Sequence, residues 1–229
     1  MDSAIVTSDN RKMAAFALPM GLFLFLLALG GLFRKFGGAF WFDSPEYWLY
    51  PAQTILCGAL LFWFWPDYSF RKPTRIVFTA LVGILVFALW ISPQVFFARA
   101  PRLIGFNPDV FSNSTAYWGT VVLRFVRLVV VVPLVEEIFW RGFLLRYFIN
   151  EKFDTVPVGT FSWFPFTLVT LGFGFGHSPA DWIAACITGA LYNLVAYRTK
   201  NLASCVAAHA LTNLLLGLWI MKTHQWGFW

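Results

Sequence analysis

Charged residues are scarce in this sequence, at only 12% of the chain, whereas 59% of the residues are hydrophobic. A soluble globular domain of ordinary composition carries about 25% charged residues, so that class is excluded and a polytopic membrane protein is indicated. The net charge of +6 comes from Lys and Arg at the ends of apolar runs, which predicts the lipid bilayer as a partner. No basic face with interleaved stacking aromatics is present, so the sequence predicts no nucleic-acid partner.

Cysteines and metal-binding spacings are scarce too. Cys57, Cys186 and Cys205 are isolated within apolar runs, with no CxxC pair and no even-numbered framework. This pattern excludes a disulfide scaffold and indicates small buried hydrophobes. The H-E-x-x-H spacing of many zinc peptidases is missing as well. Without a repeat, a low-complexity tract or a linker, residues 1–229 are expected to form a single integral membrane domain.

The sequence instead contains seven long apolar runs, many with aromatic residues near their edges. They cover about residues 13–33, 47–65, 76–97, 115–149, 161–176, 182–197 and 202–220. A run of about 20 apolar residues is long enough to cross a bilayer as a helix. We therefore predict an all-α, polytopic transmembrane helix bundle of about seven spans, or eight if the fourth run is split.

The fourth run, about residues 115–149, exceeds the hydrocarbon thickness of roughly 30 Å at a rise of about 1.5 Å per residue. Ser114 is its expected N-cap, and Pro133 is expected to kink it. Arg124 and Arg127 lie in its first half. The sequence leaves open whether they line a polar cavity or extend toward the membrane surface.

The second half of this run carries two adjacent carboxylates and an arginine. Glu137 and Arg141 are four residues apart, so on a helix they share one face and can form an ion pair. Glu136 points about a quarter-turn away and has no local partner. A buried, unpaired carboxylate is a candidate general base. The structural alternative is an ion-pair cluster that only ties helices together.

Two of the three histidines lie in later apolar runs. Phe173 and His177 are four residues apart, and so are His209 and Asn213. A single histidine among apolar residues is usually a satisfied core residue. Two of them, together with an unpaired glutamate and an asparagine in register, favour a chemical site. His224 lies in the polar C-terminal segment and is read as a surface residue.

Glu136-Glu137-x-x-x-Arg141, Phe173-x-x-x-His177 and His209-x-x-x-Asn213, in this order, resemble the CPBP family. Its members are intramembrane proteases related to the CAAX prenyl-protein endopeptidase and to bacteriocin-processing and immunity proteins. The resemblance covers about residues 124–216, within an expected catalytic core of about 115–220. It implies hydrolysis of a peptide bond in a membrane-associated substrate, which is either prenylated or signal-bearing.

The resemblance also implies roles for individual residues. Glu136 matches the catalytic glutamate, with His177 sharing the activation of a water molecule. His209 and Asn213 match residues that stabilise the oxyanion, and Glu137 and Arg141 match the second acid and the arginine.

Whether a metal takes part stays open at the level of sequence. If zinc is bound, its ligands would be Glu136, His177 and His209, three protein groups plus a water. Because the H-E-x-x-H spacing is missing, a glutamate-activated water that requires no cofactor is favoured.

Details of the sequence resemble CAAX-protease-related proteins of bacteria with exosortase-type sorting systems, which implies a multi-pass protein of the bacterial inner membrane. The alternative function is a catalytically idle scaffold or an immunity-type binding protein, with the polar cluster joining helices.

The depths of the two histidines in the membrane pose a geometrical problem. In straight spans His177 lies about 24 Å and His209 about 10 Å from its helix start. The two meet only if the fifth helix starts outside the membrane or ends early in the stretch 172–176.

Overall fold

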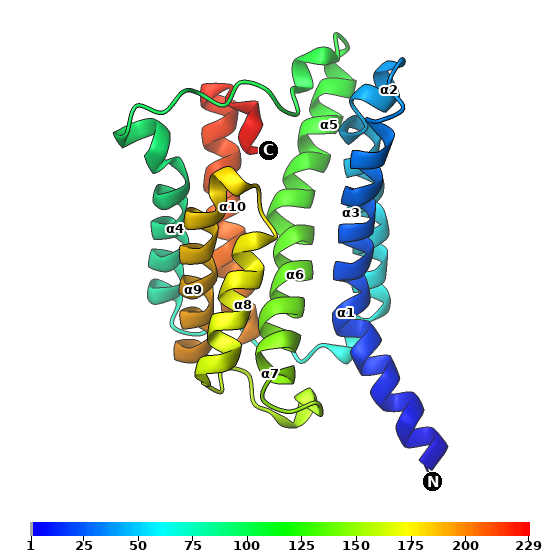
Figure 1. The fold of residues 1–229 in the computed structure, drawn as a ribbon, viewed down its shortest axis with the longest axis vertical. Coiled ribbons are helices and arrows are strands. Elements are labelled where there is room, and N and C mark those ends of the chain that lie inside the picture. The colour runs from blue at the N-terminus through cyan, green and yellow to red at the C-terminus, as the bar shows by residue number, and fades with distance from the viewer. Residues whose placement is uncertain (1) are drawn as a thin grey trace. The chain divides into compact units, whose positions relative to one another are not determined.

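Every regular element in the described part of the chain is a helix, which confirms the all-α prediction (Figure 1). The structure is a computed structural model that describes residues 2–229, with side chains from Asn10 onward. The helices are α1 (Asp2–Phe33), α2 (Phe40–Asp43), α3 (Glu46–Trp63), α4 (Ile76–Phe96), α5 (Ser114–Val126), α6 (Val132–Glu137), α7 (Leu145–Tyr147), α8 (Trp163–Phe175), α9 (Trp182–Thr199) and α10 (Leu202–Thr223).

The contacts of the chain divide it into two compact units. The first comprises Met1–Ser69, Arg102–Val135 and Ile220–Trp229, and the second comprises Phe70–Pro101 and Glu136–Trp219. The expectation of a single membrane domain stays a prediction. All the residues proposed from the sequence as site residues fall within the second unit.

Four helical segments are long and apolar enough to cross a membrane: Asn10–Phe33, Ile76–Phe96, Ser114–Tyr147 and Leu202–Thr223. The shorter helix α8 is also apolar. Only 22% of the most apolar window of α4 is buried inside the protein, although its mean hydropathy is 2.3. Exposed apolar surface of this extent is costly in water and suits contact with lipid acyl chains.

The predicted long fourth run forms one continuous span, Ser114–Tyr147. Its N-cap is Asn113 rather than Ser114, because the Asn113 Oδ1 accepts hydrogen bonds from the backbone N–H groups of Thr115 and Ala116. Pro133 does not end the helix. The five residues Arg127–Val131 before α6 are wound as a π-helix, which accommodates a residue that cannot donate a backbone hydrogen bond.

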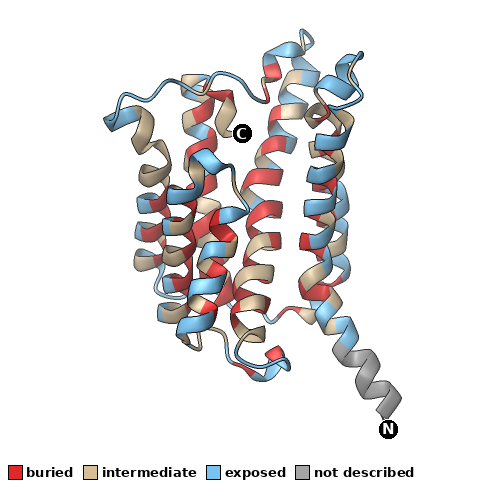
Figure 2. Cartoon of the chain, in the orientation of Figure 1, coloured by how far each residue is buried: buried red, intermediate tan, exposed pale blue. Residues whose placement is uncertain are grey.

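In the second unit, α8 packs along α9, and α4 packs against α9. Glycines permit these close approaches. A Cβ added to Gly174 would collide with the Cys186 sulfur, and one added to Gly189 would lie 3.2 Å from the carbonyl oxygen of Thr170. Small residues commonly form such contacts between membrane helices. In Figure 2, α8 and α9 each have both buried and exposed residues along their length.

In the first unit, α1 packs on α3, and the buried Gln53 amide donates to the carbonyl of Phe23 at 2.8 Å. Arg124 and Arg127 lie in the same unit, 3% and 7% exposed. The Arg127 Nε donates to the Gln53 Oε1 at 2.7 Å. The sequence left open whether these two arginines line a polar cavity or extend toward the membrane surface. Neither side chain extends to the surface, and both are buried against aromatic rings.

Candidate active site

Glu137 and Arg141 form the ion pair that their spacing predicts. Glu137 is the last residue of α6, and Arg141 lies in the π-helical turn Ile138–Leu144 that follows. Both side chains are fully buried, and the Arg141 Nη1 lies 3.1 Å from the Glu137 Oε1. Widened π turns are frequent at functional sites.

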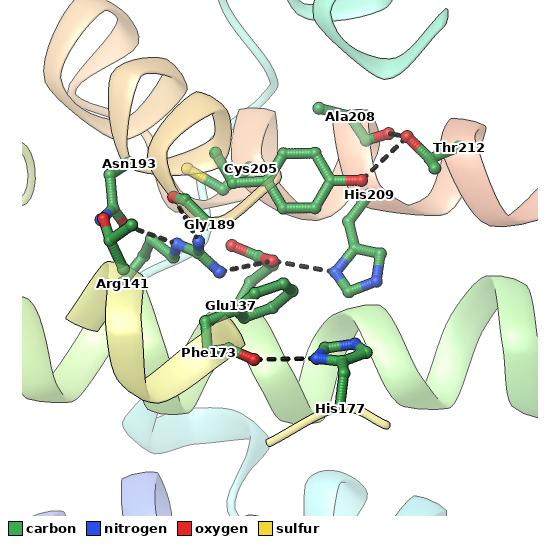
Figure 3. A network of polar contacts seen from close by, with 12 residues as sticks. Glu137, Arg141, Phe173, His177, Gly189, Asn193, Cys205, Ala208, His209 and Thr212 are labelled. Atoms are coloured by element: carbon green, nitrogen blue, oxygen red, sulfur yellow. Dashed lines mark hydrogen bonds and ion pairs between the residues drawn. The ribbon is translucent and has the colours of Figure 1, made fainter. Parts of the chain in front are cut away.

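The guanidinium of Arg141 also ties this span to α9 (Figure 3). Its Nε donates to the Asn193 Oδ1 at 2.9 Å, and its Nη2 donates to the carbonyl of Gly189 at 2.9 Å. The Phe173 ring lies 4.9 Å from the Arg141 guanidinium carbon. The buried cation therefore has a carboxylate, two neutral acceptors and an aromatic face, which together offset its desolvation.

His209 on α10 contacts the same carboxylate oxygen as Arg141. Its Nδ1 lies 2.9 Å from the Glu137 Oε1, and its ring stacks on Tyr192 with centroids 5.0 Å apart. An ionised carboxylate only accepts hydrogen bonds, so the Nδ1 of His209 carries a proton and the Nε2 is left for other partners. The second carboxylate oxygen, Oε2, is buried and has no hydrogen-bond partner within the described residues.

His177 follows the end of α8, and its ring folds back onto that helix. Its Nδ1 lies 2.8 Å from the carbonyl oxygen of Phe173. Because a carbonyl only accepts, this nitrogen carries the proton and the Nε2 holds an unshared electron pair. The Trp182 Nε1 donates to the His177 carbonyl at 3.0 Å, and the Trp90 ring lies 5.6 Å from the imidazole.

Phe173 lies next to both imidazoles. Its ring centroid is 4.9 Å from that of His177 and 6.4 Å from that of His209. In Figure 3 the second nitrogen of each imidazole points away from Arg141. The depth difference expected of straight spans does not separate the two imidazoles, since both lie beside the Phe173 ring.

Glu136 is partly exposed, one position before the buried Glu137. Within the described part of the chain its carboxylate forms neither a hydrogen bond nor an ion pair, as its position on the helix predicts. Asn213 is buried on α10, one turn after His209. The catalytic roles of Glu136, His177, His209 and Asn213 stay predictions.

Several buried partners of the site were missed at the sequence level. Asn193 and Gly189 hold Arg141, whereas Tyr192 stacks on His209 and donates from its hydroxyl to the Thr212 Oγ1 at 2.8 Å. The only local signal was a polar Asn193 inside an apolar run. Its partner lies 52 residues earlier in the chain, so no spacing rule connects the two.

The residues proposed as zinc ligands do not assemble into a metal site. Among the described residues, no three His, Cys, Asp or Glu side chains lie close enough together to hold a metal ion. Glu136, His177 and His209 as placed here therefore do not fit zinc.

Residues 118–215 match the family model described as Type II CAAX prenyl endopeptidase Rce1-like. This segment contains the acidic motif and both histidine motifs. The resemblance seen in the motifs is thus confirmed, and the match to the Rce1-like model supports a CAAX-type intramembrane peptidase that is integral to the membrane. No curated protein and no solved structure matches the chain significantly.

Proposed function

We propose that this protein hydrolyses a peptide bond in a membrane-anchored protein or peptide by means of a glutamate-activated water. The substrate is prenylated or signal-bearing, and the site of action is the bacterial inner membrane. One observation carries the proposal: two imidazoles, each with its Nδ1 hydrogen-bonded, flank the ring of Phe173 in the unit that also contains Glu136.

Water activation falls to Glu136 and His177. Glu136 has no internal partner to compete for a proton, so its carboxylate can accept one from water. The unprotonated Nε2 of His177 can accept a hydrogen bond from the same water and orient it for attack on the scissile carbonyl. The proton taken up then passes to the amine that leaves when the peptide bond breaks.

Stabilisation of the oxyanion falls to His209 and Asn213. The Asn213 amide is a natural hydrogen-bond donor. The Nε2 of His209 donates only when the ring is an imidazolium, because its Nδ1 proton is already directed at Glu137. The Glu137 carboxylate stabilises that charged ring. Glu137 therefore favours the form of His209 that can donate a hydrogen bond to the developing negative charge.

Arg141 and Asn193 hold this carboxylate in place. Arg141 shares the Glu137 Oε1 with His209, while Asn193 and Gly189 fix the guanidinium against α9. Functional side chains need such support to stay within about 0.5 Å of a productive geometry. A scaffold needs only this network, whereas a peptidase also needs Glu136, His177 and Asn213.

The experiment that tests the proposal compares membranes containing wild-type protein or Glu136→Gln, with exposed Glu151→Gln as the control for loss of an acid. Peptides released from membrane proteins are identified by mass spectrometry. We expect cleaved termini with wild type and Glu151→Gln that are missing with Glu136→Gln. Identical peptide sets from all three membranes would favour the scaffold.

A further inference from the structure

Tyr192 of α9 is fully buried and packs face to face on the His209 imidazole. The two ring centroids are 5.0 Å apart, and the ring planes are inclined by 30°. Phe173 also lies beside this imidazole, but it presents an edge, with centroids 6.4 Å apart and planes inclined by 71°. Of these two aromatic neighbours, only Tyr192 lies nearly parallel to the imidazole.

A parallel neighbour matters because one hydrogen bond does not fix the plane of the His209 ring. The Nδ1 lies 2.9 Å from the Glu137 Oε1, but a ring held through one atom can still tilt about that contact. The terminal torsion of a histidine side chain is broad and does not oppose such a tilt. The Nε2, on the far side of the ring, would be displaced. The Tyr192 face opposes this motion, since the stacked arrangement is lost when the planes open.

Tyr192 is itself held through its hydroxyl group. The hydroxyl donates to the Thr212 Oγ1 at 2.8 Å. Thr212 follows His209 by three residues on α10, so the two side chains lie on the same side of that helix. The ring and the hydroxyl of Tyr192 therefore contact α10 at neighbouring positions, and the ring cannot swing away from His209 without loss of the hydrogen bond.

Thr212 is fixed in turn by the backbone of α4. Its hydroxyl accepts the Tyr192 proton and directs its own proton to the carbonyl oxygen of Gly83 at 2.8 Å. The helices approach closely here because residue 83 is a glycine, at which an added Cβ would lie 2.7 Å from the Ala208 carbonyl oxygen. Functional side chains keep a productive geometry only when their supports are also held, and this series of contacts ends on a helix backbone.

The Tyr192 ring contacts a second member of the same network. The Arg141 guanidinium carbon lies 5.5 Å from its centroid. Arg141 and His209 share the Glu137 Oε1, so one ring lies against both groups that hold this carboxylate oxygen. A tyrosine that only fills the core needs burial and a partner for its hydroxyl, and neither requires a parallel imidazole.

We propose that Tyr192 is a positioning residue, whose ring keeps the Nδ1 of His209 on Glu137 and the Nε2 directed at the developing oxyanion. The inference rests on the proposed function, because the direction of the Nε2 affects the reaction only if His209 meets the substrate. Tyr192 acts through His209 and does not itself touch the reacting atoms.

The turnover of Tyr192→Phe and Tyr192→Leu on a peptide identified from membranes tests this role. Tyr192→Phe keeps the flat face and should retain most of the wild-type kcat. Tyr192→Leu should lower kcat at least about tenfold with little change in KM, since a misplacement of about 1 Å can cost about 10²-fold. The control Tyr197→Leu removes a partly buried tyrosine of the same helix and should keep the wild-type kcat. An unchanged kcat in Tyr192→Leu, or an equal fall in Tyr192→Phe, would overturn the proposal.

A double-variant comparison shows whether Tyr192 acts through His209. In the His209→Ala background, the further change Tyr192→Leu should leave the residual kcat unchanged, because the group to be positioned is already missing. Two independent roles would instead multiply the two losses, and that result would contradict the proposal.

¹⁵N NMR of the histidine rings measures the position of His209 without turnover. Its signals are assigned by their loss in His209→Ala. We expect a ring protonated at Nδ1 in wild type, Tyr192→Phe and Tyr197→Leu, and exchange of that proton between the two nitrogens in Tyr192→Leu. An unchanged Nδ1 signal in Tyr192→Leu would overturn the proposal.

The NMR measurement also separates failure of this inference from failure of the proposed function. Near-normal cleavage by Glu136→Gln would refute the function, whereas the His209 signals would still decide the role of Tyr192. If Tyr192→Leu does not fold, Tyr192→Met replaces it in every measurement, because methionine fills irregular space without a flat face. The same results are then expected, and the same results would overturn the proposal.

Discussion

Glu137 and His209 are 72 residues apart in the chain, yet the Glu137 Oε1 lies 2.9 Å from the His209 Nδ1. The same oxygen lies 3.1 Å from the Nη1 of Arg141. A single carboxylate oxygen therefore joins a structural ion pair to a histidine of the predicted site. Under the proposed function, Glu137 links stability to catalysis, and substitutions on its two sides should have different effects.

Arg141→Ala should mainly destabilise the protein. Removal of the guanidinium leaves Glu137 buried without its cation and leaves the Asn193 Oδ1 and the Gly189 carbonyl without a donor. Loss of one partner of a buried pair costs about 3–5 kcal/mol. Thermal unfolding in detergent measures the effect. A variant that is as stable as wild type but inactive would show that the arginine acts in the chemistry instead.

His209→Ala should mainly lower the rate. Glu137 keeps its contact with Arg141, so most of the buried network survives, whereas the predicted oxyanion donor is lost. We expect kcat to fall by about 10²–10³-fold with a small change in unfolding temperature. His224→Ala, which removes an exposed histidine, is the matched control. An unchanged kcat in His209→Ala would remove His209 from the proposed mechanism.

The local parts of this arrangement are predictable from the sequence. The Glu137–Arg141 pair follows from a spacing of four residues, and the apolar runs foretell the helices. The contacts of Glu137 with His209 and of Arg141 with Asn193 are not predictable in this way. They depend on which faces of α9 and α10 point toward the neighbouring helices. Glycines at close helix contacts influence that orientation more than hydrophobic periodicity does.

The position of His177 was open for a related reason. A straight fifth span would have carried it away from His209. α8 ends at Phe175, and the His177 Nδ1 lies 2.8 Å from the Phe173 carbonyl oxygen. Helix ends depend on local capping and packing, which a run of apolar residues does not determine.

Gly174→Ala should separate α8 from α9. The added Cβ would collide with the Cys186 sulfur, and the surrounding backbone leaves little room to adjust. Overpacking of this kind costs about 1–3 kcal/mol. Thermal unfolding of Gly174→Ala should show this loss, and the double variant with Cys186→Ala should recover most of it. No recovery in the double variant would mean that Cys186 is not the obstacle. Gly119→Ala, at an open position on α5, is the control.

Zinc content separates the two chemistries considered for the site. As placed, Glu136, His177 and His209 do not form a ligand set, so we expect purified active protein to contain less than one zinc per chain and to lose only part of its activity to chelators. Elemental analysis measures the metal. One zinc per chain, lost together with activity in the His177→Ala and His209→Ala variants, would replace the glutamate-activated water with a zinc mechanism.

The most direct test of the account is the turnover number of Glu136→Gln, reconstituted in lipid vesicles with a cleaved peptide identified from membranes. The account predicts a fall in kcat of at least about 10²–10⁴-fold, as expected on loss of a general base. The unfolding temperature should match that of wild type, since Glu136 is partly exposed and the Glu137–Arg141 pair is intact. A well-folded Glu136→Gln protein with near-normal turnover would contradict the account.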